Sequence, residues 1–185
     1  MTKRIVALAA AAASVWTGAP PAAGTNLVRM DVRALALSAT SIVRARCLAV
    51  ASRPDAGSVS TFTTFQTLER WKGPAPQQFT LRLPGGEAAG FTVRVEGAPR
   101  FFPGEEVVLF LARTRSGDIT IVSWAQGTFR IRMNPLAGVE EALQDTGGLT
   151  LLDGHSPRGS AGARRNLSLA VLRAQVARSL AERPQ

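Results

Sequence analysis

The strongest constraint on the fold is a series of short runs between Thr40 and Met133 in which apolar and polar residues alternate. Alternation of period two predicts half-buried β-strands, and the Gly and Pro residues between the runs predict turns. One run, 105–112, is apolar on both sides, and we expect it to be the most buried strand. The predicted strands cover residues 41–51, 59–71, 79–83, 91–95, 105–112, 119–124 and 129–133.

The second of these strands has an irregular spacing of large side chains. Phe65, Leu68 and Trp71 follow one another at intervals of three, and a flat strand cannot direct them to one face. A β-bulge near Gln66 or Thr67 would restore the facing, and bulges bend strands where barrels close. The fold class predicted for residues 39–133 is therefore mainly β, a small closed or partly open barrel.

Three further segments flank this barrel. Residues 25–38 form a lead-in in which Asp31 is placed to cap a short helix. Residues 134–165 are rich in Gly and are expected to be a flexible loop with one short strand at 149–152. Residues 166–185 predict a C-terminal amphipathic helix, capped by Asn166 or Ser168, with an apolar stripe formed by Leu169, Leu172, Val176 and Leu180.

Residues 1–24 have the pattern of a signal peptide. Lys3 and Arg4 precede an apolar stretch, 5–16, that is too short to span a membrane, and small residues follow it. We expect cleavage before Thr25 and a secreted or periplasmic protein with no transmembrane segment after cleavage. The chain has a single cysteine, Cys47, so it forms no internal disulfide, and we expect this thiol to be buried.

The net charge of +9 does not by itself indicate a nucleic-acid partner. Nearly all of it is arginine, scattered along the chain with no run longer than Arg164-Arg165, whereas a nucleic-acid-binding protein usually concentrates its charge. A solvated basic surface is the simpler interpretation. The aromatic residues that could stack on bases are expected in the core instead, namely Phe62, Phe65, Phe79, Phe91, Phe110 and Phe129.

No recognisable catalytic or metal-binding pattern is present in the sequence. The only histidine, His155, lies in the predicted flexible loop, where a general base cannot be held in place. One His and one Cys far apart do not predict a zinc site, and the acidic pairs are isolated from one another. We therefore expect a protein that is not an enzyme and that needs no cofactor.

The strand pattern resembles the opening and later part of the netrin-like domain, the OB-type barrel of tissue inhibitors of metalloproteinases. The resemblance rests on the run 39–46, on Phe65-x-x-Leu68-x-x-Trp71-Lys72-Gly73-Pro74, and on residues 104–112 and 117–124. It implies an OB-like barrel with a binding role. In those inhibitors an N-terminal cysteine reaches the zinc of the target, but here the expected mature N-terminus is Thr25 and no cysteine is near it, so the inhibitory residues do not carry over. The chain also resembles bacterial exported proteins of unknown function with Trp-Lys-Gly and Pro-Gly-Gly signatures.

The leading hypothesis is an exported, non-catalytic protein-binding module whose partner is another exported protein, with a secreted protease as one candidate. Proline-stiffened apolar loops bind at low entropic cost. The candidate surface therefore combines the loop Phe101, Phe102 and Pro103 with the turn Pro84, Gly85 and Gly86. The alternative is an envelope barrel that binds a small molecule or a glycan at its mouth, in a pocket lined by Trp71 or Trp124.

Overall fold

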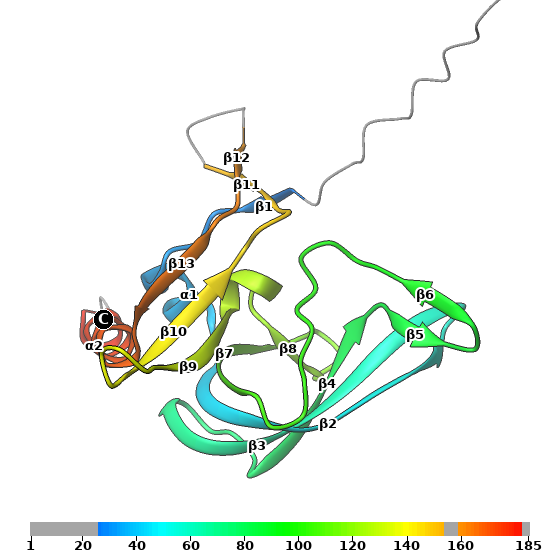
Figure 1. Cartoon of the computed structure of the whole chain (residues 1–185), viewed down its shortest axis with the longest axis horizontal. Coiled ribbons are helices and arrows are strands. Elements are labelled where there is room, and N and C mark those ends of the chain that lie inside the picture. Colours follow the sequence, from blue (N-terminus) through cyan, green and yellow to red (C-terminus); the bar gives the residue numbers. More distant parts are fainter. Residues whose placement is uncertain (1–25, 154–158, 183–185) are drawn as a thin grey trace, which may run out of the picture.

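The computed structural model describes residues 26–153 and 159–182, and shows a mainly β fold with a helix near the C-terminus (Figure 1). The predicted signal peptide and His155 lie outside the described residues. The strands of the main sheet are β2 Ser41–Asp55, β3 Ser58–Lys72, β4 Gln78–Pro84, β7 Glu106–Arg113, β8 Ile119–Ile121, β9 Thr128–Asn134, β10 Val139–Asp145 and β13 Arg164–Ser168.

The main sheet is antiparallel and strongly curled. Its order is β13-β10-β9-β7-β2-β3-β4, with β8 paired to β7. The sheet does not close on itself. The fold class predicted from the sequence, a mainly β, partly open barrel with a C-terminal helix, is therefore confirmed.

The remaining elements surround this sheet. The small strands are β1 Asn26–Val28, β5 Gly86–Ala88, β6 Phe91–Val93, β11 Thr150–Leu152 and β12 Ser160–Ala161. The helices are α1 Val32–Ser38, the 3-10 turn η1 Trp124–Gly127 and α2 Leu169–Ala181. Strand β1 pairs in parallel with β11, while β5 and β6 form a separate hairpin beside the far ends of β2 and β3 (Figure 1).

The β2–β3 hairpin is longer than predicted and contains irregularities. Its two-residue turn is Ala56-Gly57, both with positive φ (48° and 79°), which suits the right-handed twist of a hairpin. The register slips so that Leu68 and Trp71 are the extra residues on β3. The predicted bulge is thus present, next to the predicted position, and a second one follows it.

The sheet separates two hydrophobic cores. The barrel core, on its inner face, is formed by Val43, Ala45, Cys47, Phe65, Phe79, Leu81, Leu83, Phe101, Val107, Leu109, Leu111 and Ile121. The helix core, on its outer face, is formed by Leu35, Ala36, Ala39, Ile42, Val108, Phe110, Phe129, Ala142, Leu169, Leu172 and Val176. Successive residues of β7 alternate between the two cores and all five from Val107 to Leu111 are buried, which confirms the strand predicted to be the most buried.

The helices cover the outer face as their sequences predict. Asp31 Oδ1 accepts a hydrogen bond from the Ala34 amide at 2.7 Å and so caps α1. The ammonium of Lys72 donates to the carbonyl oxygens of Ala36, at 2.7 Å, and of Ala39, and so binds the C-terminal end of this helix. The Trp-Lys-Gly signature therefore has a structural role, because its lysine joins β3 to α1.

The prediction of a flexible loop over residues 134–165 was wrong in part. Strand β10 lies in this segment, between β9 and β13, and β13 occupies the expected start of the C-terminal helix. The helix begins only after Ser168, whose side chain accepts from the Val171 amide at 3.2 Å. Strand β10 buries Ala142 and Gln144, and such small or polar residues do not produce an apolar alternation.

The prediction that Phe91 lies in the core was also wrong. Phe91 is 70% exposed, because β6 pairs with β5 and the hairpin stands apart from both cores. Phe62 is half-buried, on the outer face of β3 under the guanidinium of Arg53, 3.8 Å from its ring centroid. The other four phenylalanines predicted for the core are buried.

Candidate binding cleft

The two loops predicted to form a binding surface meet around one cleft. The cleft has a volume of about 220 Å³, and its lining residues place it where the far ends of β2 and β3 meet the β5–β6 hairpin. Its walls come from the inner face of β2 and β3, from the turn 83–87, and from residues 92–95 and 98–102. We call it the mouth cleft.

The floor of the mouth cleft continues the barrel core. Thr61, Thr63 and Phe65 alternate along the same face of β3, so the two threonines extend the line of the buried Phe65. Phe101 packs edge-on against Phe65, with ring centroids 5.0 Å apart, and also lines the cleft. Phe101 therefore closes the core below and forms an apolar wall above.

Thr63 lines the cleft and carries a buried hydroxyl group without a hydrogen-bond partner among the described residues. The residue as a whole is fully buried. Its cross-strand neighbours, Val50 on β2 and Leu81 on β4, are apolar and offer no acceptor. A buried hydroxyl without a partner costs about 1–3 kcal/mol, so such a group needs a structural or functional explanation.

The hydroxyls of Ser52 and Thr61 and the carbonyl of Gly85 form a hydrogen-bonded chain in which the direction of each bond is fixed. Thr61 Oγ1 donates to the carbonyl oxygen of Gly85 at 2.6 Å, and it lies 2.8 Å from Ser52 Oγ. Since Thr61 has a single hydroxyl hydrogen, Ser52 must donate to Thr61. The Ser52 oxygen is then left with acceptor lone pairs only.

The turn that contains Gly85 and Gly86 passes so close to the hydrogen-bonded hydroxyls of Ser52 and Thr61, and to the Val93 carbonyl, that it requires glycine at both positions. Both have positive φ, 88° and 133°. A Cβ at Gly86 would collide with the hydroxyls of Ser52 and Thr61, and a Cβ at Gly85 would lie 2.8 Å from the Val93 carbonyl oxygen. The Pro-Gly-Gly signature therefore fixes the wall of the mouth cleft.

The residues of the predicted surface divide into a buried and an exposed set. Phe101 is 4% exposed and belongs to the core, whereas Phe102 is 67% exposed at the rim. Arg100 and Glu87 are exposed residues of the cleft lining. Pro103 is exposed and follows the lining residues along the chain.

The two predicted tryptophans lie elsewhere. Trp71 is near the opposite end of β3, eight to ten residues along the strand from the cleft-lining threonines Thr61 and Thr63. Its Nε1 donates to Glu69 Oε2 at 3.1 Å, and its ring packs against the helix core. Trp124 is half-buried in η1. Neither tryptophan lines the mouth cleft.

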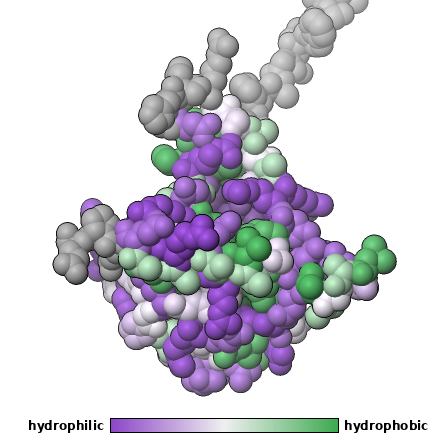
Figure 2. Space-filling view, turned by 90° about the vertical axis from the view of Figure 1, so that its left-hand side faces the viewer, coloured by the Kyte–Doolittle hydropathy of each residue, from purple (hydrophilic) through white to green (hydrophobic). Residues whose placement is uncertain are grey.

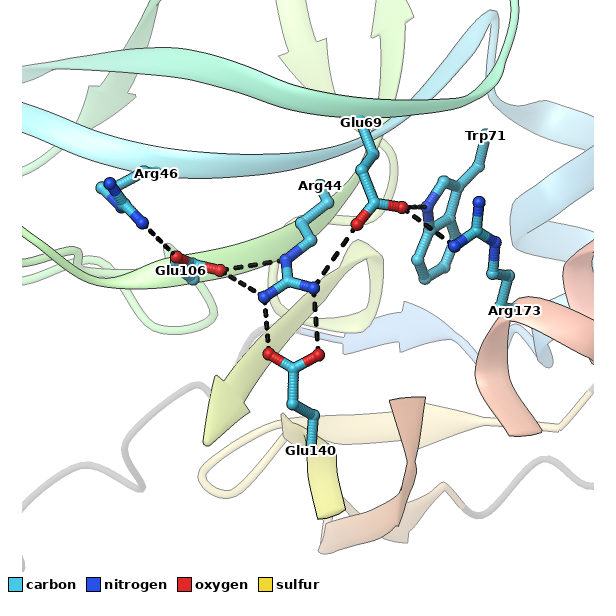
Figure 3. A network of polar contacts seen from close by, with 7 residues as sticks. All are labelled: Arg44, Arg46, Glu69, Trp71, Glu106, Glu140 and Arg173. Carbon is cyan, nitrogen blue, oxygen red and sulfur yellow. Dashed lines mark hydrogen bonds and ion pairs between the residues drawn. The ribbon is translucent and has the colours of Figure 1, made fainter. Parts of the chain in front are cut away.

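The densest group of ionisable residues lies on the outer face of the sheet (Figure 3). Arg44 on β2 binds Glu106 of β7, Glu140 of β10 and Glu69 of β3, at 2.6, 2.6 and 3.4 Å. Arg46 binds Glu106 and Arg173 of α2 binds Glu69, at 2.6 and 3.0 Å. Three arginines thus balance three glutamates, and we call this group the arginine–glutamate cluster.

The pKa values in the cluster favour the ionised forms. Burial alone would lower the pKa of Arg44, but hydrogen bonds to Glu140 and Glu106 outweigh it and raise the pKa above its ordinary value. Burial would raise the pKa of Glu106, but hydrogen bonds from Arg46 and Arg44 hold it below its usual range. Carboxylates held ionised and paired in this way serve to join strands and not to transfer protons.

The buried thiol is poorly suited to chemistry. Cys47 is 1% exposed in the barrel core, as predicted, and burial raises its pKa, so that the reactive thiolate is disfavoured. Within residues 26–153 and 159–182, three or more His, Cys, Asp or Glu side chains do not gather in a group that could hold a metal ion. No helix in the same ranges is long and apolar enough to cross a membrane.

The side of the molecule that carries α2 is mainly hydrophilic. Figure 2 shows charged and polar side chains over most of this side, with apolar residues gathered in narrower patches. This agrees with the scattered arginines of the sequence.

The hydroxyl-bearing residues of the mouth cleft were missed by sequence reasoning. In Thr61-Phe62-Thr63-Thr64 the threonines indicate a strand, as β-branched residues do. The signal for a site was that Thr61 and Thr63 share the face of Phe65, a position where apolar residues are expected. Only the fold shows that Ser52 and Gly85 meet them there.

Comparisons of the chain with protein-family models, with curated proteins and with solved structures gave no match.

Proposed function

We propose that this chain is an exported, non-catalytic binding module that holds an anchor side chain of another exported protein in the mouth cleft. The observation that carries the proposal is the meeting of two predicted loops around a cleft whose floor contains a buried, unpartnered hydroxyl, that of Thr63.

The size of the cleft favours a protein side chain over a complete small ligand. Pockets for drug-sized molecules usually measure about 300–1,000 Å³, and the mouth cleft measures about 220 Å³. Phe102, exposed at the rim, adds an aromatic surface outside the cleft. A buried pocket beside an exposed aromatic ring is a common arrangement for a binding hot spot.

The resemblance to the netrin-like domain makes a secreted protease the first class of partner to test. The inhibitory cysteine of that family has no counterpart here, so any contact with a protease would use the mouth cleft and its rim.

The test is affinity capture of exported proteins from the source organism by the immobilised chain. Three forms are compared, namely the wild type, Phe102→Ala at the rim and Leu136→Ala. Leu136 is 97% exposed in the turn between β9 and β10, outside the cleft, and is the matched control for loss of an exposed apolar side chain. We expect a protein that is retained by the wild type and by Leu136→Ala but depleted with Phe102→Ala. A partner retained equally by all three forms would contradict the proposal.

The second candidate function, binding of a small molecule or a glycan, is favoured by the hydroxyls of Ser52, Thr61 and Thr63. Thermal-shift measurements with a panel of monosaccharides test it. A saturable rise in melting temperature with one sugar, absent in Thr63→Val, would favour this candidate over the protein partner.

A further inference from the structure

A second hollow adjoins the mouth cleft and is lined by several charged residues. It measures about 300 Å³, and residues 95 and 98–100 line both the mouth cleft and this hollow. Two of its lining residues, Arg94 and Arg100, are exposed arginines. We call it the arginine hollow. Because the two hollows share a wall, one extended segment of a partner can contact both.

A turn of the chain places both arginines on this wall. They belong to the segment that joins β6 to β7 (Figure 1). The Ala98 amide donates to the Val95 carbonyl oxygen at 3.2 Å, which turns the chain between Arg94 and Arg100. The Arg100 carbonyl oxygen accepts from Arg130 Nη2 at 2.5 Å, so the end of the segment is bound to β9. The two guanidinium groups therefore extend from a fixed backbone, which reduces the entropy lost when a ligand binds.

The acidic residues of the arginine hollow interact with other groups. Asp145 Oδ2 lies 2.9 Å from Arg164 Nε, and the partner arginine is outside the lining of the hollow. Glu96 also has an interaction of its own, and its Oε2 lies beside Gly148, 3.0 Å from the position that a Cβ would take there. The negative charges of the lining are therefore already engaged.

Arg94 and Arg100 are the surplus cations of the hollow. Arg130, the third arginine of its lining, is bound to Glu105. Among the described residues, neither Arg94 nor Arg100 has a side-chain partner. The mouth cleft itself is lined by one cation and one anion, Arg100 and Glu87. An anionic group near the two hollows is therefore attracted to the arginine hollow and repelled by Glu87.

Other exposed arginines lack an apolar cleft beside them. Arg165 and Arg178 line a hollow beside α2 together with two acidic residues, and this hollow shares no lining residue with the mouth cleft. Arg115, in the turn between β7 and β8, lines neither the mouth cleft nor the arginine hollow. The combination of free cations with an adjoining apolar cleft therefore singles out Arg94 and Arg100.

We propose that the partner presents an acidic side chain, aspartate or glutamate, close to the residue that it inserts into the mouth cleft. Arg94 and Arg100 bind its carboxylate in the arginine hollow through charge-assisted hydrogen bonds. The apolar lining of the mouth cleft, which includes Leu83 and Phe101, contacts the inserted side chain. This inference rests on the proposed function and specifies the chemistry of the partner's segment.

Nuclear magnetic resonance of the isotope-labelled full chain tests the inference with defined probes. The probes are the capped pentapeptide Ac-Glu-Gly-Leu-Gly-Glu-NH₂ and the same peptide with both Glu residues replaced by Gln or by Lys. Residues two apart in an extended chain point to the same side, and an acid on each side of Leu allows either chain direction. We expect the Glu peptide to shift the Val95 methyl signals and the Nε–H signals of Arg94 and Arg100 saturably. The Gln peptide should bind about tenfold more weakly, and the Lys peptide more weakly still.

Variants of the protein separate these two arginines from the net positive charge of the chain. Arg94→Gln and Arg100→Gln should each weaken binding of the Glu peptide about threefold, and the double variant should bind the Glu and Gln peptides equally. Arg115→Gln is the matched control, because Arg115 is also exposed and has no side-chain partner among the described residues, and it should keep the tenfold preference. The melting temperature of the double variant should equal that of the wild type, since no interaction of the fold is lost.

The outcomes distinguish this inference from the proposed function. Equal binding of the Glu and Gln peptides, an unchanged preference in the double variant, an equal loss with Arg115→Gln, or no shift with any peptide would overturn the acidic segment. The mouth cleft would nevertheless remain the binding site if capture of the partner depended on Phe102 and not on Arg94 and Arg100. Galacturonic acid carries the same carboxylate, and saturation of the arginine hollow by this sugar at a lower concentration than by the Glu peptide would overturn the assignment to a protein segment.

Discussion

Arg44 and Glu140 face one another as two parallel forks, although 96 residues separate them along the chain. Arg44 Nη1 lies 3.0 Å from Glu140 Oε2, and Nη2 lies 2.6 Å from Oε1. Strands β9 and β7 lie between β10 and β2 in the sheet order, so the pair spans the curvature of the sheet directly. A bidentate pair is both stronger and more specific in geometry than a single hydrogen bond.

Loss of Arg44 is expected to destabilise the fold substantially. Arg44→Met keeps much of the side-chain volume but leaves Glu140 without a cation and weakens the pairing of Glu106 and Glu69. Removing one partner of a fully buried pair costs about 3–5 kcal/mol. The side chain of Arg44 is 16% exposed, so we expect about 2–3 kcal/mol, measured as the free energy of unfolding in urea.

The control for this change is Arg33→Met, which breaks the exposed pair between Arg33 and Glu182. Exposed pairs contribute about 0.2–1 kcal/mol. Equal losses for the Arg33 and Arg44 variants would mean that the arginine–glutamate cluster adds no more than a surface ion pair.

The contribution of Glu106 to stability is expected to disappear in acid. Its pKa is lower in the folded state than in the unfolded chain, where a glutamate has a pKa of about 4.3. Its stabilising effect is therefore complete above about pH 4.3 and is lost as the pH falls through the lower, folded-state pKa. The wild type should exceed Glu106→Gln by about 1–2 kcal/mol in free energy of unfolding at pH 7, and the difference should shrink below about pH 4.3. Urea titrations at several pH values measure this, and a difference that grows in acid would contradict it.

Adjacent phenylalanines should respond very differently to truncation. Phe101→Ala removes a buried ring packed on Phe65 and should cost about 3–5 kcal/mol in free energy of unfolding. Phe102→Ala removes an exposed ring and should change it by less than about 0.5 kcal/mol. Thermal or urea unfolding checks both values, and a large loss with Phe102→Ala would show that its ring supports the fold and is not a free binding surface.

Alanine substitutions at Gly86 and Gly90 distinguish the cost of a steric collision from the cost of backbone strain. Both have positive φ, 133° and 78°, so an alanine at either position is strained by about 1–3 kcal/mol. A Cβ at Gly90 meets open space, whereas one at Gly86 collides with Ser52 and Thr61. Gly86→Ala should therefore lower the free energy of unfolding by about 1–3 kcal/mol more than Gly90→Ala does. Equal effects would show that the turn moves away from the hydroxyl chain at no cost.

The sequence reveals those parts of the fold in which hydrophobicity alone determines the structure. Strand β7 is apparent because Val107 to Leu111 are all apolar and all buried. Strand β10 is not, because Ala142 and Gln144 are its inward residues, and Gln144 satisfies its amide on the carbonyl oxygen of Gln126 at 2.5 Å. A polar side chain can be buried when a distant backbone group pairs with it, and the local sequence does not show that partner.

The same limit applies to the candidate site. The turn with Gly85 and Gly86 and the loop with Phe102 are marked by Gly, Pro and aromatic residues, so both are visible in the sequence. The lack of a partner for Thr63 depends on Val50 and Leu81, which belong to two other strands. No local pattern around Thr63 carries that information.

Successive residues of β7 point into different cores, so neighbouring side chains report separately on the packing of the barrel core and of the helix core. Val107 contributes to the barrel core and Val108 to the helix core, although one peptide bond joins them. An occupant of the mouth cleft would contact residues of the barrel core, such as Leu83 and Phe101, and would not contact the helix core directly. Methyl groups of the two valines, observed together during a titration, would therefore reveal whether binding stiffens one half of the molecule or is transmitted through the wall to the other.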